Sequence, residues 1–277
     1  MTSYSILVNT CDKFDDCWEP FFKLWKEFWP DCKGSLYLNT EYKEYAYEGL
    51  SIESLKVCER NNFPKTQRAT WSQCLKWALE AIEDDIVLYL QEDYFLKDTV
   101  KNEEVEYYVS LMESHKNIQC IQLTDQAVVA DGDSEYKDLN KVKFKQRYRV
   151  SCQAALWRKS ELLKLIREYE DAWEFEEFGS LRSEVLESEY YVVDTNYVKL
   201  NTYEIIPYVF TGIVQGRWFE EVVPLFKKYG IEVDFSKRGF LKDAKKKPFF
   251  KRVKYRLNKL PKIVRNNREL NLLRKKK

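Results

Sequence analysis

Short apolar runs alternate with amphipathic stretches along the first half of the chain. Residues 5–9 and 86–90 are apolar runs of strand length, and the second suits a central strand covered on both faces. Residues 70–83 carry apolar side chains at intervals of three and four, which predicts an amphipathic helix capped by Thr70 or Ser72. The pattern further predicts strands at 36–40, 52–57, 118–123, 189–194 and 203–210, one or two strands within 148–157, a loop over 125–146, and helices at 16–29, 103–116, 159–169 and 219–229.

This order of elements indicates the fold class. Strands and helices alternate in the first half and the second half is mixed, so we expect an α/β domain with a mainly parallel sheet flanked by helices. Ligands of such sheets bind beyond the carboxyl ends of the strands, and residues 10–13 and 91–94 would lie at that edge. The sequence has no G-x-G-x-x-G and no G-x-x-x-x-G-K-[ST] motif, which removes the main support for a dinucleotide-binding or P-loop protein.

Composition and charge divide the chain in two. Apolar residues make up 44% and aromatic residues 16% of the 277 residues, which argues against a disordered protein. Residues 235–277 contain 18 Lys and Arg against two acidic residues, a net charge of +16, whereas residues 1–234 have a net charge of −15. We therefore expect a catalytic domain over 1–234 and a basic helical arm over 235–277 whose partner is a polyanion.

An apolar stripe in the arm indicates which polyanion. Phe250, Val253, Leu257 and Leu260 follow one another at intervals of three, four and three, with Lys and Arg around them. This pattern is typical of a helix that lies on an anionic membrane surface. Nucleic acid is the competing polyanion and is not the expected partner; a helix that packs on another protein and a disordered basic tail remain as alternatives.

Cysteine usage and the chain start bear on the compartment. The seven cysteines are widely spaced without a C-x-x-C pair, which argues against a zinc site or a redox dithiol and favours reduced thiols. His115 is the single histidine and lies in a charged helical stretch, so Cys–His catalysis is not expected. The start lacks a basic region followed by an apolar one, and no apolar run reaches the 18 residues of a membrane span. We expect a cytoplasmic protein, peripheral at the inner face of the cell membrane.

Gln91, Glu92 and Asp93 form the first chemically notable group. Carboxylates at the end of a buried strand are unfavourable unless they meet a cation or open onto a cleft. Such oxygen ligands suit Mg²⁺ or Mn²⁺ bridging to substrate phosphates. The alternative is that the acids simply mark the end of the strand and face solvent.

Two further segments carry candidate groups. Residues 171–179 place Glu174, Glu176 and Glu177 among three aromatic residues, and a carboxylate beside an apolar surface has the raised pKa that helps a general base. The alternative is the solvated start of an amphipathic helix. Residues 212–218 combine two glycines with Arg217, which suits a contact to a diphosphate, or else form a turn before a helix.

The chain resembles a family at these positions. The stretch W-S-x-x-L-K-x-A-L followed by V-L-Y-L-Q-E-D-Y-F is similar to GT-A-type bacterial glycosyltransferases of capsule and lipopolysaccharide biosynthesis. The resemblance implies a GT-A-like fold, a divalent cation on Asp93 with Glu92 assisting, and Glu176 as the acceptor base with Glu174 and Glu177 behind it. It also implies donor contacts from Thr10, Asp12, Arg68, Gln91, Glu92, Asp93 and Arg217. The chain departs from the family in having Gln91 at the first acid of the D-x-D-like motif and no histidine late in the sequence.

The resulting hypothesis is an enzyme that transfers a sugar from a nucleotide-sugar, expected to be a UDP-sugar, to a lipid-linked saccharide in surface polysaccharide biosynthesis. Two other classes compete with it. One is a non-catalytic protein that binds membranes or polyanions, and the other is a nucleotidyltransferase, whose Gly-rich N-terminal signature is absent.

Overall fold

A nine-stranded mixed sheet forms the centre of the computed structural model, which describes residues 3–126, 128–243 and 249–276 and, in the last helix, side chains from residue 257 onward. Every strand except β7 and β8 runs in the same direction, so the expected mainly parallel α/β fold class is confirmed. In spatial order the strands are β3 (Ile52–Ser54), β2 (Ser35–Asn39), β1 (Ser5–Asn9), β4 (Ile86–Gln91), β8 (Ala155–Arg158), β5 (Ile118–Gln122), β9 (Glu189–Val193), β7 (Leu139–Val142) and β6 (Ala130–Asp133).

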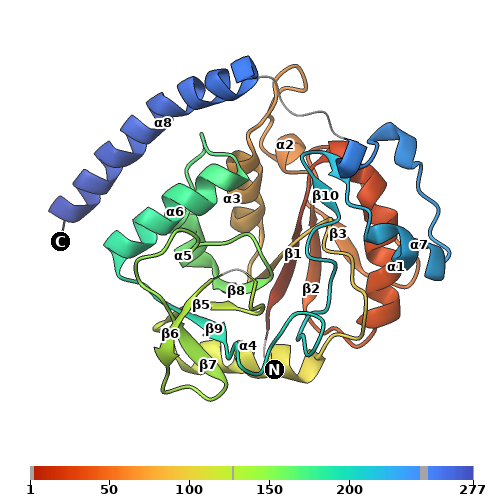
Figure 1. The fold of residues 1–277 in the computed structure, drawn as a ribbon, viewed down its shortest axis with the longest axis horizontal. Helices are drawn as coiled ribbons and strands as arrows, with labels where there is room; N and C mark the ends of the chain where they lie inside the picture. Colours follow the sequence, from red (N-terminus) through yellow and green to blue (C-terminus); the bar gives the residue numbers. More distant parts are fainter. Residues whose placement is uncertain (1–2, 127, 244–248, 277) are drawn as a thin grey trace.

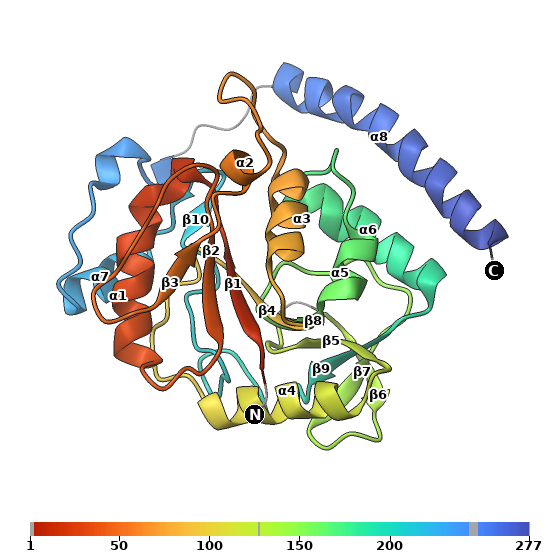
Figure 2. The same cartoon turned by 180° about the vertical axis from the view of Figure 1, so that it is seen from behind.

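Helices cover the sheet on two sides. α1 (Trp18–Phe28) and α3 (Trp71–Ala81) lie on opposite sides of β1 and β2 in both views (Figures 1 and 2). α3 begins where the sequence predicts, because Thr70 and Gln73 cap it reciprocally as a capping box. The other α-helices are α2 (Val57–Arg60), α4 (Asn102–Ser114), α5 (Lys159–Leu165), α6 (Ala172–Leu186), α7 (Val222–Lys228) and α8 (Phe249–Lys275), with 3₁₀ turns η1 (Asp12–Cys17), η2 (Phe235–Lys237) and η3 (Leu241–Asp243).

Two expected elements are corrected. Residues 125–146, expected as loop, contain strands β6 and β7, and β7 pairs with β9 through Leu139 opposite Val193. β7 shows no regular alternation, because Leu139, Asn140 and Val142 are buried and only Lys141 is exposed, so its pattern does not indicate a strand. Residues 203–210, expected as a strand, instead run beside 95–101 with a single isolated bridge, because Pro207 has no N–H to donate.

The C-terminal helix α8 lies along α6 (Figure 1). Arg182 of α6 is fully buried and donates to both carboxylate oxygens of Glu170, at 2.7 and 2.6 Å, and to Oδ1 of Asn266 in α8 at 2.9 Å. Leu270 is buried against the same surface, and Arg167 pairs with Glu269 at 2.5 Å. α8 is thus held to the body mainly by polar side chains.

The opposite face of α8 is apolar and open to solvent. Leu257, Leu260, Val264 and Leu272 are each more than half exposed. The stripe predicted from the sequence is therefore present at Leu257 and Leu260, while the side chains of Phe250 and Val253 lie outside the described residues. No helix among the described residues combines the length and the apolar character needed to cross a membrane.

Candidate functional site

The carboxyl ends of β1, β2 and β4 meet at one edge of the sheet. Asn9 is in register with Gln91 on one side and Asn39 on the other. Its side chain accepts a hydrogen bond from Asn39 Nδ2 at 2.7 Å and donates one to Tyr89 Oη at 3.1 Å, so amide groups fill the sheet just below the edge. The two segments that the sequence places at this edge, 10–13 and 91–94, therefore lie side by side.

Asp93 is a buried acid at this edge with two hydrogen-bond donors on one carboxylate oxygen. Its side chain is buried, and Oδ2 accepts from Thr211 Oγ1 and from the Ile213 N–H, both at 2.9 Å. Its backbone carbonyl accepts from the Gly212 N–H at 2.9 Å. Burial nevertheless raises the pKa of Asp93 above its usual range. The segment 211–213 is thereby fixed across the end of β4.

Glu92 adds a second carboxylate with a cation near it. Burial and the charge of Asp93 raise the pKa of Glu92 well above its usual range, and Arg238 opposes that shift. Arg238 pairs with Asp16, donating from Nε to Oδ2 at 2.6 Å, and lies over the Phe14 ring at 4.4 Å from the centroid. The sequence analysis missed Arg238 and Asp16, since Arg238 counts only as part of the basic arm.

The Glu92–Asp93 pair fits a hard divalent cation. Both groups offer carboxylate oxygens, and one oxygen of Asp93 is fixed by its two donors, which sets the orientation of the carboxylate. Two adjacent acids with raised pKa values repel one another when ionised, and a bound cation removes that repulsion. Glu92 and Asp93 are therefore the residues that would hold such an ion.

Asp12 and Thr10 lie at the same edge and make hydrogen bonds to neighbouring segments. The Asp12 carboxylate accepts from the N–H groups of Glu41 and Tyr42, both at 2.9 Å, and so fixes the loop that follows β2. Thr10 is buried and its hydroxyl accepts from Trp18 Nε1 at 3.0 Å. Both residues therefore lie at the predicted edge, and their side-chain oxygen atoms accept hydrogen bonds from the protein itself.

The remaining donor candidates lie around the same edge. Arg68 is exposed and close enough to Glu41 and Cys11 for its charge to lower the pKa of each. Gln91 donates to Tyr89 Oη at 3.3 Å. Arg217 is in β11 (Arg217–Trp218), which forms a two-stranded hairpin with β10 (Ile213–Val214), and donates to the Arg238 carbonyl at 3.3 Å.

The three candidate acids at the start of α6 separate into two groups. Glu174 completes a capping box with Asp171 and pairs with Lys262 of α8 at 2.6 Å. Glu177 pairs with Lys259 of α8 at 2.5 Å. Both therefore hold α8 to the body, a use that the sequence does not reveal because the lysines lie more than 80 residues away.

Glu176 faces the sheet edge instead. Its Oε1 accepts from the Cys152 N–H at 2.8 Å, and burial raises the pKa of the carboxyl above its usual range. The Cys152 carbonyl in turn accepts from Tyr94 Oη at 2.8 Å, and Tyr94 follows Asp93 directly. Residue 152 thus connects the partly buried Glu176 to the segment that follows β4.

Comparisons with known proteins give similarity only to solved structures. No family model matches the chain, and no curated protein matches it in sequence. TarS 1–349 from S. aureus is 14% identical over 70% of this chain and 58% of its own, with a TM-score of 0.44. Its complex with UDP-GlcNAc is 13% identical over 70% of this chain and 56% of its own, with a TM-score of 0.45. Glucosyl-3-phosphoglycerate synthase from Mycobacterium tuberculosis, in complex with Mn²⁺, UDP and phosphoglyceric acid, is 11% identical over 66% and 64%, with a TM-score of 0.40. The chain spans less than two thirds of each of these proteins.

Proposed function

We propose that the protein is a glycosyltransferase that transfers a sugar from a UDP-sugar to a lipid-linked saccharide in surface polysaccharide biosynthesis. One observation supports the proposal: the partly buried Glu92 and the buried Asp93 follow β4, and the partly buried Glu176 is connected to them by the hydrogen bonds of Cys152 to Glu176 and to Tyr94. A glycosyl transfer needs a group for the departing diphosphate and a base for the incoming hydroxyl.

These residues account for each bond and proton that changes in the transfer. The bond between the anomeric carbon and the phosphate oxygen breaks, and its electron pair leaves with UDP. The acceptor oxygen forms the new bond to the anomeric carbon, and its proton passes to Glu176, which favours inversion. A divalent cation on Asp93 and Glu92 would supply positive charge to the diphosphate oxygens.

Burial prepares Glu176 for proton transfer. Its raised pKa makes the carboxylate a stronger base than an exposed one, while the Cys152 N–H fixes its orientation at 2.8 Å. No hydrogen bond joins Oε2 to another described residue, so this oxygen is available to an acceptor hydroxyl. Trp173, one turn earlier on α6, is 60% exposed and offers an aromatic face to a saccharide.

We infer that the enzyme works at an anionic membrane. The polar contacts of α8 with the body turn its apolar side chains outward, at Leu257, Leu260, Val264 and Leu272. The surrounding arm has a net charge of +16. Apolar insertion together with attraction to anionic headgroups is the combination that binds an interfacial helix, and it supports a lipid-linked acceptor.

UDP release tests the catalytic proposal. Wild type and the variants Glu176→Gln and Asp93→Asn are assayed with UDP-glucose, UDP-galactose and UDP-GlcNAc, with and without Mn²⁺, while a thermal-shift screen reports binding. Glu176→Gln should bind the donor and lose about 10²-fold or more in turnover, whereas Asp93→Asn should lose donor binding as well. Glu113→Gln, an exposed acid at the end of α4, is the matched control and should behave as wild type.

The same assay separates the competing functions. A wild type that neither binds nor hydrolyses any UDP-sugar, with or without Mn²⁺ and acceptor, would refute the proposal. Pyrophosphate release from a nucleoside triphosphate and a sugar phosphate would replace it with a nucleotidyltransferase.

Vesicle flotation tests the membrane part. Truncation at residue 235 is unsuitable, because Phe235 packs on Trp218 and Arg238 binds Asp16 of the body. We expect Leu260→Glu with Val264→Glu to abolish flotation with phosphatidylglycerol vesicles and to leave the melting temperature unchanged. Ser110→Glu with Ser114→Glu, which adds the same charge to exposed positions of α4, should still float. Equal flotation of the two double variants would contradict membrane binding through α8.

A further inference from the structure

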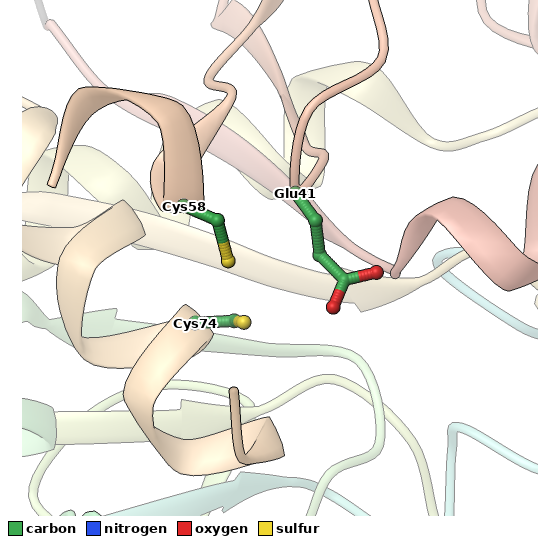
Figure 3. Close-up of side chains that lie close together, drawn as sticks. All are labelled: Glu41, Cys58 and Cys74. Atoms are coloured by element: carbon green, nitrogen blue, oxygen red, sulfur yellow. The ribbon is translucent and has the colours of Figure 1, made fainter. Parts of the chain in front are cut away.

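Glu41, Cys58 and Cys74 form a compact group at one side of the sheet edge (Figure 3). One carboxylate oxygen and the two sulfur atoms all lie within 4.8 Å of one another. The three residues come from the loop after β2, from α2 and from the first turns of α3. We propose that they bind a thiophilic divalent cation of the zinc type.

The distances suit such an ion. Zinc bonds to sulfur at about 2.3 Å and to carboxylate oxygen at about 2.0–2.2 Å, so tetrahedral ligands lie roughly 3.5–3.8 Å apart. Three ligand atoms already within 4.8 Å need only small side-chain movements to close on a metal. The ligand type also selects the ion, because thiolates favour zinc over magnesium and manganese. The group is therefore chemically distinct from the all-oxygen pair at Asp93.

The group is shielded from solvent. Cys58 and Cys74 are 1% and 5% exposed, so both sulfur atoms lie in the interior. Glu41 is partly buried beside them, and no Lys or Arg forms an ion pair with it among the described residues. Its Oε2 accepts from the Asp12 N–H at 3.1 Å, which holds the carboxylate in place. Two buried sulfur atoms and a carboxylate oxygen therefore lie together, and a bound cation would balance the negative charge of the carboxylate.

Metal binding here would link three segments beside the carboxyl edge of the sheet. The cation would displace the two thiol protons to solvent and bond to two thiolates and one carboxylate. It would join the loop held by Asp12 to α2 and α3, and so fix both ends of the segment that contains Arg68. Cys11, two residues after β1, is near enough to Cys74 for their charges to interact and is a candidate for the fourth position.

Metal content and cobalt spectroscopy test the site on the full chain. Protein purified under reducing, anaerobic conditions and exposed to Zn²⁺ should retain one equivalent after desalting. Replacement by Co²⁺ should give the absorption of tetrahedral cobalt together with a thiolate charge-transfer band. Cys58→Ser and Cys74→Ser should each weaken zinc binding at least tenfold, and Glu41→Gln should weaken it while keeping the charge-transfer band.

Two controls make the result specific. Cys32→Ser removes a partly exposed thiol elsewhere and should bind zinc like wild type. Asp93→Asn should also keep the zinc equivalent, which separates this site from the proposed catalytic one. If a cysteine variant does not fold, alkylation of wild type replaces it: zinc should protect Cys58 and Cys74 from iodoacetamide, and a chelator should remove the protection. Absence of bound metal, equal loss in Cys32→Ser, or a Cys58–Cys74 disulfide in the anaerobic protein would overturn the proposal.

Discussion

Gly212 lies where the segment that binds Asp93 crosses the end of β4. A Cβ atom at this position would lie 2.2 and 2.6 Å from two ring carbons of Phe95 and 2.9 Å from the Asp93 carbonyl oxygen. The Phe95 ring is fully buried, with the ring of Phe226 centred 4.9 Å away and that of Trp218 6.0 Å away, so it cannot turn aside alone. Gly212→Ala must therefore push the segment off β4.

The expected loss follows from these contacts. Overpacking a core by one methyl group costs about 1–3 kcal/mol, and we expect the upper end because one of the close atoms is backbone. Movement of the segment also strains the hydrogen bonds from Thr211 and Ile213 to Asp93. Urea unfolding followed by tryptophan fluorescence measures the loss, and a melting-temperature shift on adding UDP measures the effect on the edge.

Gly179→Ala is the matched control. Gly179 lies within α6, and its added Cβ would meet Val150 at 3.4 Å and the Phe175 ring at 3.6 Å, which are ordinary contacts. Alanine is favoured over glycine in a helix interior by about 1 kcal/mol, so this variant should be as stable as wild type or up to that amount more stable. A loss below about 0.5 kcal/mol in Gly212→Ala, or an equal loss in both variants, would refute the packing at Asp93 described above.

Three further predictions concern the base, the anchor of α8 and the acceptor side. Because burial raises the pKa of Glu176 above its ordinary 4.5, turnover should be lost as pH falls through that higher value, and a kcat–pH profile with its acid limb at or below 4.5 would contradict this. Arg182→Ala leaves the Glu170 carboxyl buried without its partner and should cost about 3–5 kcal/mol in urea unfolding; since burial raises the pKa of Glu170 to about 7, the cost should grow from pH 6 to pH 8. Trp173→Ala should change stability by less than about 0.5 kcal/mol and raise the KM for the acceptor, and an unchanged KM would remove Trp173 from the acceptor site.

Local sequence signals predicted the elements that depend on local physics. The predictions of β1, β4 and α3 are confirmed. Burial on both faces of a strand produces a continuous apolar run, and a reciprocal cap needs only residues three apart, so both signals lie in a short stretch of sequence. The strand expected at 203–210 is absent because Pro207 cannot donate to a ladder, and the apolar side chains there are buried by other contacts, such as the stacking of Tyr208 on Tyr94 at 4.7 Å.

For the site, the sequence by itself determined that Glu92 and Asp93 follow a buried strand and that the loop after β1 shares their edge, because parallel strands end together. Only the tertiary structure decided what the acids do. In the folded chain Glu176 accepts from the Cys152 N–H, whereas Glu174 and Glu177 pair with lysines of α8. Arg238 pairs with Asp16, which is 222 residues away in the sequence. The tertiary structure also gathered Glu41, Cys58 and Cys74 without any spacing motif. Strand and helix patterns repeat every two to four residues, whereas these contacts depend on how whole elements pack, and no short stretch of sequence records that.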